Sequence, residues 1–147
     1  MKKWLILTGL LLVIGIASLI YIGTRLSTTQ PIDAGITYEV VSTPEAKQKG
    51  LGGRSEVPHD YGMLFVFAAP NIYRIWMKDM LVPIDILWLE GNGTIIGIEE
   101  AVSPDSYPKT YAPPSPVRLV LELRAGEARL KNLRVGSRIL LPVQLQK

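Results

Sequence analysis

The sequence has no cysteine and a single histidine, and these two scarcities remove several kinds of chemistry. Without cysteine the chain has no disulfide, no thiol nucleophile and no Cys-based zinc site. One histidine cannot build a histidine-rich metal centre. His59 stands in the polar stretch 58–62, which is typical of a surface turn. We therefore expect no metal and no cofactor.

Sequence motifs of common enzyme classes are also missing. The chain has no GxSxG nucleophile elbow, no glycine-rich phosphate loop between a strand and a helix, and no EF-hand spacing. Its net charge of +3 comes from Lys2, Lys3 and Arg25, which leaves 13 basic and 13 acidic residues in the remainder. Nucleic acids are bound by basic surfaces, so this neutral remainder argues against a nucleic-acid partner.

A long apolar run opens the chain. Leu5–Ile22 is long enough to span a bilayer, and Lys2 and Lys3 precede it. With these lysines inside the cell, the rest of the chain faces the periplasm or the exterior. A signal peptide cleaved near residues 15–17, which would release a secreted protein, is the alternative. Because the apolar run continues past that point, we expect an uncleaved single-pass membrane anchor.

The chain is long enough for one globular domain with its own core. We assign residues 1–23 to the membrane anchor, residues 24–35 to a polar linker and residues 36–147 to the domain. The membrane, reached through the anchor, is the partner that this organisation predicts.

Short strands dominate the predicted domain. Alternating or apolar runs predict strands at residues 36–41, 63–67, 72–77, 84–89, 94–101, 117–123 and 138–145. Thr43 as N-cap, Pro44 at the first helical position and Gly50 as a stop predict a helix of about two turns. A second short helix is predicted at residues 126–133. The proline-rich residues 103–116 are predicted to form a loop at a rim or lid. These elements predict a mainly β (α+β) domain, a small closed or half-closed β-barrel with two short helices.

Asp85 is the most unusual residue of the predicted strands. It lies within Ile84–Leu89, where both faces of the strand are apolar, so its carboxylate is predicted to be buried. A buried carboxylate needs a cation or several hydrogen-bond donors. Arg54 and Lys78 are the nearest cations in the sequence. A guanidinium can bind both carboxylate oxygens, and we therefore predict an Arg54–Asp85 ion pair.

Other polar and aromatic residues extend this candidate cluster. Asp79 stands near a turn, and Glu122 lies opposite the apolar face of its strand. One interpretation makes Asp79, Asp85 and Glu122 acid–base groups or hard-metal ligands of a site. The other, which we favour, makes Asp85 the structural partner of Arg54, Asp79 a turn cap and Glu122 a partner of Arg118 or Arg124. Trp76 belongs either to the core, the more common place for a large ring, or to a ligand groove.

Four segments of the domain together resemble the DUF192 family, an uncharacterised conserved domain of bacteria and archaea. They read GLGGR at residues 50–54, GMLFVF at 62–67, WMKDM at 76–80 followed by PIDI at 83–86, and LELRAG at 121–126. The resemblance covers about residues 38–143 and implies a small β-rich domain, often exported, without an established activity.

The segments depart from the family pattern at four positions. Gly52 stands where the family usually has Met, Asp79 and Met80 where it has Asn-Thr, and Ile84 where it has Leu. The loss of Asn-Thr removes an amide and a hydroxyl, so a ligand bound through those groups is not implied for this chain.

Two functions remain open. The first is a membrane-tethered extracytoplasmic binding or accessory module that uses the cluster Arg54, Trp76, Lys78, Asp79, Asp85 and Glu122. The second is an extracytoplasmic hydrolase or lyase that acts through Asp79, Asp85 and Glu122, for which a solvent-open carboxylate pair is required. An Asp85 that is fully enclosed and paired with Arg54 favours the first function.

Overall fold

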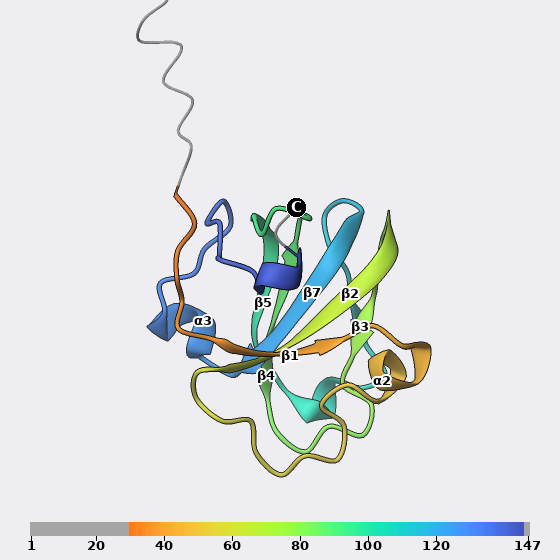
Figure 1. Ribbon diagram of the computed structural model, residues 1–147. Coiled ribbons are helices and arrows are strands. Elements are labelled where there is room, and N and C mark those ends of the chain that lie inside the picture. The colour runs from red at the N-terminus through yellow and green to blue at the C-terminus, as the bar shows by residue number, and fades with distance from the viewer. Residues whose placement is uncertain (1–29, 146–147) are drawn as a thin grey trace, which may run out of the picture.

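Five strands form an open sheet at the centre of the domain (Figure 1). The structure is a computed structural model and describes residues 30–145. In the sheet order β1-β2-β7-β4-β5, β1 is parallel to β2, and the other neighbouring strands are antiparallel. The strands are β1 (Thr37–Val41), β2 (Tyr61–Asn71), β7 (Val117–Arg124), β4 (Ile84–Leu89) and β5 (Ile95–Val102). The strands predicted at 36–41, 84–89, 94–101 and 117–123 are confirmed to within one residue at either end.

The predicted barrel is wrong, because β1 and β5 remain at opposite edges of the sheet. The last predicted strand, residues 138–145, forms no ladder. It makes one bridge to Thr94, beside β5, and one to Ile32, ahead of β1. Pro142 has no N–H with which to extend either bridge, and the 3-10 helix η2 (Val143–Leu145) follows it. The C-terminal segment therefore links the two sheet edges through single bridges and a few backbone hydrogen bonds, without a ladder.

Apolar side chains cover both faces of the sheet, because neighbouring residues of each strand point to opposite sides. The first layer, which we call the α2 face, includes Met63, Phe65, Ile86 and Trp88 with Leu51, Val57, Met77 and Tyr111. The second layer, the α3 face, includes Leu64, Leu87, Leu121 and Leu123 with Ala128, Leu133, Ile139 and Leu141. All six residues of β4 are buried. The apolar pattern of that strand on both faces is the reason.

Helix α2 (Pro44–Lys49) follows the capping chemistry of its sequence. The Thr43 hydroxyl accepts the Ala46 N–H at 3.3 Å, and Pro44 occupies the first turn. At the other end, Gly50 has a φ of +51° and donates its N–H to the Ala46 carbonyl at 2.9 Å. The predicted first helix is therefore confirmed. The second, α3 (Glu127–Leu130), is shorter than predicted and begins after Gly126.

A separate two-stranded sheet lies beside the main one. Strand β3 (Ile75–Trp76) pairs with β6 (Thr110–Tyr111). The strand predicted at 72–77 is thus reduced to two residues, while β2 continues as far as Asn71. The predicted loop 103–116 contains β6 and the 3-10 helix η1 (Pro104–Ser106), so it has more regular structure than the sequence indicated.

Within residues 30–145 the structure shows no helix with the length and apolar character needed to cross a bilayer. The predicted anchor, residues 1–23, and the first part of the predicted linker lie outside the described residues.

Candidate functional site

Glu122 is a buried acid in the middle of the sheet. It lies on β7 between Met63 of β2 and Ile86 of β4, so two apolar side chains flank it on the α2 face. Only 5% of the residue is exposed. Its Oε2 atom is buried and has no hydrogen-bond partner among the described residues. The predicted ion pair of Glu122 is therefore wrong, because Arg118 donates to the Phe67 carbonyl and Arg124 lies against His59. A buried polar atom without a partner is costly, so this carboxyl requires an explanation beyond packing.

Burial raises the pKa of the Glu122 carboxyl to about 8, and the positive charge of Arg54 offsets part of this effect. Loss of hydration penalises the ionised form of an acid. The carboxyl is therefore mostly protonated at neutral pH. In that form it has one O–H donor together with acceptor capacity.

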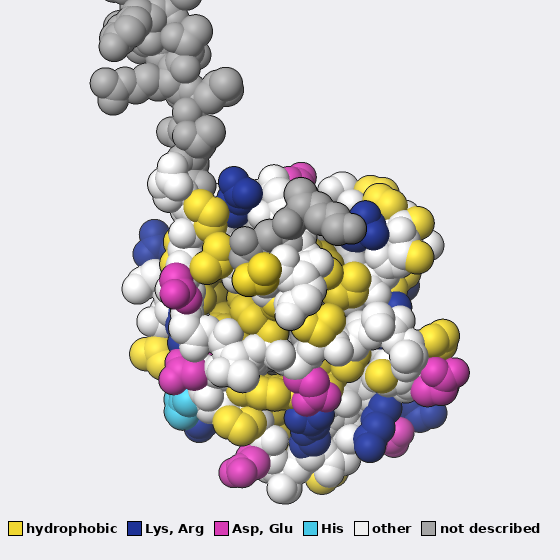
Figure 2. Space-filling view, viewed as in Figure 1, with side chains coloured by type: hydrophobic (Ala, Val, Ile, Leu, Met, Phe, Trp, Pro, Cys, Tyr) yellow, Lys and Arg dark blue, Asp and Glu magenta, His cyan; other side chains and the backbone are white. Residues whose placement is uncertain are grey.

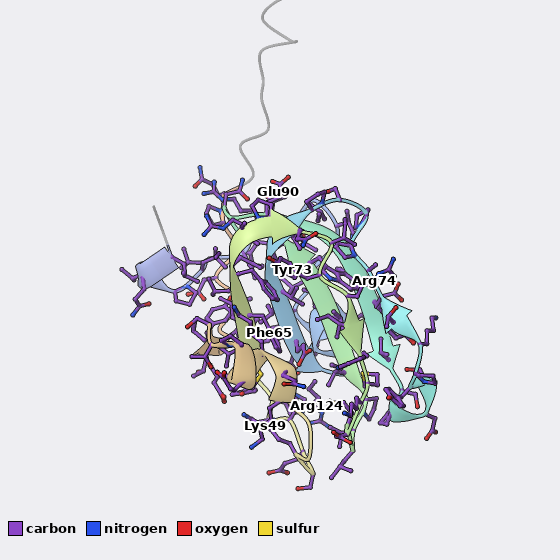
Figure 3. The ribbon with its side chains drawn as sticks, turned by 90° about the vertical axis from the view of Figure 1, so that its right-hand side faces the viewer. Lys49, Phe65, Tyr73, Arg74, Glu90 and Arg124 are labelled. Carbon is purple, nitrogen blue, oxygen red and sulfur yellow. The ribbon has the colours of Figure 1, made fainter. Side chains whose placement is uncertain are left out.

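A narrow pocket of about 70 Å³ opens onto Glu122. Gly50 lines this pocket close to the acid. A Cβ atom added to Gly50 would lie 3.7 Å from Glu122 Oε2 and 3.4 Å from Phe65 Cζ. Because glycine has no side chain, the chain can approach the acid closely at this point. In Figure 3, Lys49 and Phe65 lie toward the α2 end of the sheet, and Glu90 lies at the far end.

Basic side chains line this pocket from two directions. Lys47 and Lys49 come from the last turn of α2, and Arg74 and Lys78 come from the residues around β3. Figure 2 shows Lys and Arg side chains over the region of α2. The rim of the pocket therefore carries positive charge, whereas its base holds an acid that is mostly neutral at pH 7.

A wider groove of about 300 Å³ shares Lys49, Trp76 and Lys78 with the narrow pocket and extends to Glu45 and Asp79. Trp76 is 47% exposed, so its predicted place in the core is wrong, whereas Trp88 is buried in the core. Asp79 is exposed and has a φ of +59°, a left-handed conformation that Asp adopts more easily than most residues. Its carbonyl accepts the Gly53 N–H at 2.8 Å, so Asp79 also helps to form the turn.

Arg54 binds different partners from those predicted. Its guanidinium contacts both carboxylate oxygens of Glu39, at 3.0 and 2.9 Å, and donates to the Tyr61 hydroxyl at 2.8 Å. Hydrogen bonds from Tyr61 and Arg54 hold the pKa of Glu39 below its usual value. The predicted Arg54–Asp85 ion pair is therefore wrong. Glu39 lies on β1, so only the pairing of β1 with β2 brings it to Arg54.

Asp85 is buried as predicted, but backbone groups satisfy it. Its Oδ1 accepts the N–H groups of Ala101 and Gly126 at 2.8 and 3.0 Å, and its Oδ2 accepts that of Ala128 at 2.9 Å. These donors belong to the end of β5 and the start of α3. The carboxylate thus fixes α3 against the sheet. Of the two predicted ways to satisfy a buried carboxylate, a cation or several hydrogen-bond donors, the structure has the donors.

The buried carboxyl groups of Asp85 and Glu122 lie on opposite faces of the sheet. Asp85 pairs with Leu123 on the α3 face, and Glu122 pairs with Ile86 on the α2 face. The structure therefore brings Trp76, Lys78 and Asp79 into one groove that reaches Glu122, while Asp85 lies apart from it. A three-carboxylate site of Asp79, Asp85 and Glu122 is not formed.

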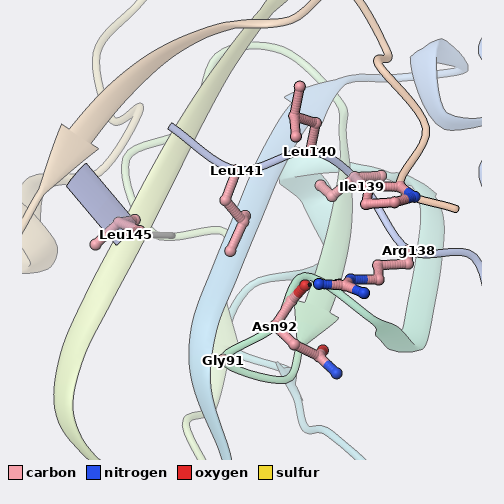
Figure 4. Close-up of a pocket in the computed structure, with 8 residues that line it drawn as sticks. Gly91, Asn92, Arg138, Ile139, Leu140, Leu141 and Leu145 are labelled. Atoms are coloured by element: carbon pink, nitrogen blue, oxygen red, sulfur yellow. Dashed lines mark hydrogen bonds between the residues drawn. The ribbon is translucent and has the colours of Figure 1, made fainter. Parts of the chain in front are cut away.

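Two further hollows lie elsewhere on the domain. The larger, about 610 Å³, contains His59, whose Nδ1 lies 2.8 Å from the buried Glu127 and whose Nε2 lies 2.7 Å from Arg124. His59 is exposed, as predicted, and its ring contacts Glu127 and Arg124. The other hollow, about 300 Å³, lies between the turn at Asn92 and the C-terminal segment, where Arg138 Nε donates to the Asn92 carbonyl at 3.0 Å (Figure 4).

Among residues 30–145, no group of three or more His, Asp or Glu side chains is placed to hold a metal ion. The Glu122 pocket remains the hollow in which a buried polar atom lacks a partner within the described part of the chain.

Comparison with known families identifies the domain. The DUF192 family, described as "Uncharacterized ACR", matches residues 26–141. The chain belongs to the DUF192 family. No curated protein matches the chain.

Two solved structures resemble this DUF192 domain. One is a protein of Sinorhizobium meliloti 1021 described as a "putative transcription regulator", with 34% identity and a TM-score of 0.67 over 70% of this chain and 79% of that one. The other is a protein of unknown function from Novosphingobium aromaticivorans DSM 12444, with 24% identity and a TM-score of 0.68 over 72% and 75% of the two chains. The second similarity concerns the fold alone.

The DUF192 segments recognised in the sequence converge on the narrow pocket. Gly50 and Leu51 come from the first segment, Phe65 from the second, Trp76, Lys78 and Met80 from the third, and Glu122 from the fourth. Segments that are 70 residues apart in the sequence therefore meet at a single place. The exception is the PIDI stretch, whose Asp85 points to the α3 face.

Three basic residues of the pocket, Lys47, Lys49 and Arg74, were absent from the predicted cluster. A signal for one of them exists in the sequence, because Arg74, Trp76 and Lys78 alternate and so share one side of an extended segment. The two lysines carry no such signal, since their position depends on how α2 packs beside β2.

Proposed function

We propose that this chain is a membrane-tethered, extracytoplasmic binding module whose ligand site is the Glu122 pocket. The observation that carries the proposal is the buried Oε2 atom of Glu122, which has no partner among the described residues and lies at the base of a pocket. A ligand group that reached this atom would supply the missing hydrogen bond. The convergence of the family segments on the same pocket supports this assignment.

The charge of the pocket rim favours a small anionic ligand. Lys49, Arg74 and Lys78 line the opening, and a positive rim attracts anions and repels cations. The exposed Trp76 ring at the same opening offers an apolar surface to the rest of the ligand. Ligand pockets commonly combine apolar walls with a few polar groups in this way.

The arrangement of the carboxyl groups favours binding over hydrolase or lyase chemistry. The proposed enzyme needed Asp79, Asp85 and Glu122 together, whereas Asp85 is enclosed on the other face with three backbone donors. The pocket therefore offers one buried acid and no paired carboxylate to act with it.

Location at the membrane rests on the apolar run Leu5–Ile22 and on Lys2 and Lys3 ahead of it. Mass spectrometry of the protein isolated from membranes tests this part of the proposal. An intact N-terminus supports the anchor, and an N-terminus beginning near Ser18 or later contradicts it.

A thermal-shift screen of the full chain in detergent tests the binding function. We expect small anions such as acetate, glycolate and phosphate to raise the unfolding temperature, and methylammonium and glycerol to leave it unchanged. The matched variant Lys78→Gln should weaken the effect of anions, whereas Lys109→Gln, which changes a lysine outside the pocket, should not. Equal shifts with both variants, or no shift with any anion, would contradict an anion site at this pocket.

A further inference from the structure

The narrow pocket admits only a small group, and this restricts the chemistry of the ligand. At about 70 Å³ it holds a few heavy atoms, since one water needs roughly 10–15 Å³ of such space. The adjoining groove of about 300 Å³ is larger and is open to Trp76. A ligand therefore places one small polar group in the pocket and its remaining atoms in the groove.

Among the described residues that line the pocket, one side chain is an acid. Glu122 is the acid at its base, Leu51, Phe65 and Met80 contribute apolar wall, and the remaining polar lining consists of basic side chains and Gln48. Glu122 has one proton to offer to one ligand oxygen, and a phosphate often brings more negative charge against this acid than a carboxylate does. A carboxylate has two oxygens, of which one can meet Glu122 and the other a basic side chain at the rim.

Two carboxyl groups in contact cannot both ionise easily, because like charges at short range oppose each other. When a ligand carboxylate meets Glu122, one proton has to lie between them. An O–H donor bound to a carboxylate oxygen forms one of the stronger hydrogen bonds in proteins. Glu122 is already suited to provide this proton, since burial raises its pKa to about 8.

We propose, resting on the function proposed above, that the Glu122 pocket binds the carboxylate of a small organic acid, and that protonated Glu122 donates the hydrogen bond that holds it. Binding therefore keeps one proton between the ligand carboxylate and Glu122. Affinity is constant while Glu122 is protonated, and it falls as the pH rises and the proton is lost.

The charged groups that face Glu122 make this pH dependence specific. They are Lys47 and Lys49 from α2, Arg74 and Lys78 from the residues around β3, and Arg54 from the loop after α2. Met63 and Ile86, which flank Glu122 on the neighbouring strands, have no titratable group. Among the described residues that line the pocket, Glu122 is the one acid.

An NMR titration of the full chain in detergent tests the inference, with the Gly50 amide as the local probe and acetate, phosphate and methylammonium as ligands at matched ionic strength. Acetate stays ionised above about pH 6, so its own charge is constant through the titration. We expect acetate to bind, with an affinity that falls about tenfold per pH unit above pH 8, the pKa of Glu122. Glu122→Gln should bind acetate with no pH dependence, because the amide donates a hydrogen bond at every pH.

Two other variants complete the test. Glu122→Met should lose acetate binding. Gly50→Ala places a methyl group 3.7 Å from Glu122 Oε2 and should weaken binding, whereas Gly53→Ala, a glycine of similar φ with open space around it, should not. If Glu122→Met fails to fold, the pH profiles of the wild type and Glu122→Gln decide the question.

The outcomes separate the two proposals. Binding of acetate that is independent of pH in the wild type, preference for phosphate over acetate, or affinity that rises with pH would overturn the carboxylate inference while leaving an anion-binding module in place. Failure of both anions to shift the Gly50 amide at any pH would overturn the proposed function as well.

Discussion

Asp85 and Glu122 are acids on adjacent strands, both nearly inaccessible to solvent, and their surroundings differ in almost every other respect. Asp85 faces α3 and accepts three backbone N–H groups. Glu122 faces α2 between apolar side chains, and one of its oxygens has no partner among residues 30–145. The comparison shows that burial alone does not identify a functional acid. The number of donors that reach it separates a structural carboxylate from a candidate binding group.

The largest expected effect on stability is that of replacing Asp85, whose carboxylate accepts three hydrogen bonds. Asp85→Ala removes three hydrogen bonds and leaves the N–H groups of Ala101, Gly126 and Ala128 without partners. One of these hydrogen bonds is buried and two are part-buried, so at about 2 kcal/mol for each hydrogen bond to a carboxylate the free energy of unfolding should fall by up to about 6 kcal/mol. Chemical denaturation of the full chain measures it. The control is Asp105→Ala at an exposed position, and a difference of less than about 1 kcal/mol between the two would show that Asp85 does not fix α3.

Glu122, the acid with an unpartnered oxygen, should make the stability of the protein depend on pH. The pKa of Glu122 in the folded state, about 8, lies above its ordinary value of 4.5, so the folded state binds the extra proton between these two values. The free energy of unfolding therefore falls as the pH rises through this window, by up to about 5 kcal/mol at about 1.4 kcal/mol per pKa unit.

Glu122→Gln removes this dependence, so the stability difference between Glu122→Gln and the wild type should grow from pH 5 to pH 8. Denaturation curves of both proteins across this range provide the measurement. Taking the difference cancels the contributions of Glu39 and Glu127. The pKa of Glu39 is lowered mainly by Tyr61 and Arg54. Burial acts to raise the pKa of Glu127, but the Asp60 N–H, His59 and Lys131 together lower it. A stability difference that does not change with pH would show that Glu122 is hydrated and has an ordinary pKa.

A smaller effect tests which acid Arg54 binds, Asp85 or Glu39. Arg54 binds Glu39 at the surface, where an ion pair contributes up to about 1 kcal/mol. Arg54→Met and Asp85→Asn should therefore destabilise additively to within about 0.5 kcal/mol in a double-mutant cycle. The matched cycle of Arg54→Met with Glu39→Gln should show coupling. Coupling of Arg54 with Asp85 and none with Glu39 would support the ion pair that the structure lacks.

Local sequence signals predicted the elements whose causes are local. Thr43, Pro44 and Gly50 fix the ends of α2 within the helix itself, and the apolar residues of 84–89 predict a buried strand. Burial of Asp85 followed from the same apolar pattern. Each of these features depends on neighbours in sequence, which a single chain displays.

Features that depend on pairing between distant segments could not be predicted. The partners of Asp85 lie 16 to 43 residues away and are backbone groups, which have no signature in the sequence. The separation of Asp85 from Glu122 depends on the register between β4 and β7. Arg54 was assigned to the wrong acid because its actual partner, Glu39, is brought to it by β1 at the sheet edge.

The single bridge at Ile32 has a mechanical consequence. The Ile32 N–H donates to the Arg138 carbonyl at 2.7 Å, and the Leu140 N–H donates to the Ile32 carbonyl at 2.9 Å. The Tyr38 hydroxyl donates to the Leu140 carbonyl at 3.1 Å. Tension applied to the chain ahead of Ile32, as a membrane tether would apply it, therefore acts first on these few hydrogen bonds at the edge of the sheet. Glu122 lies two strands further in, so such a pull can break the edge contacts before it deforms the pocket.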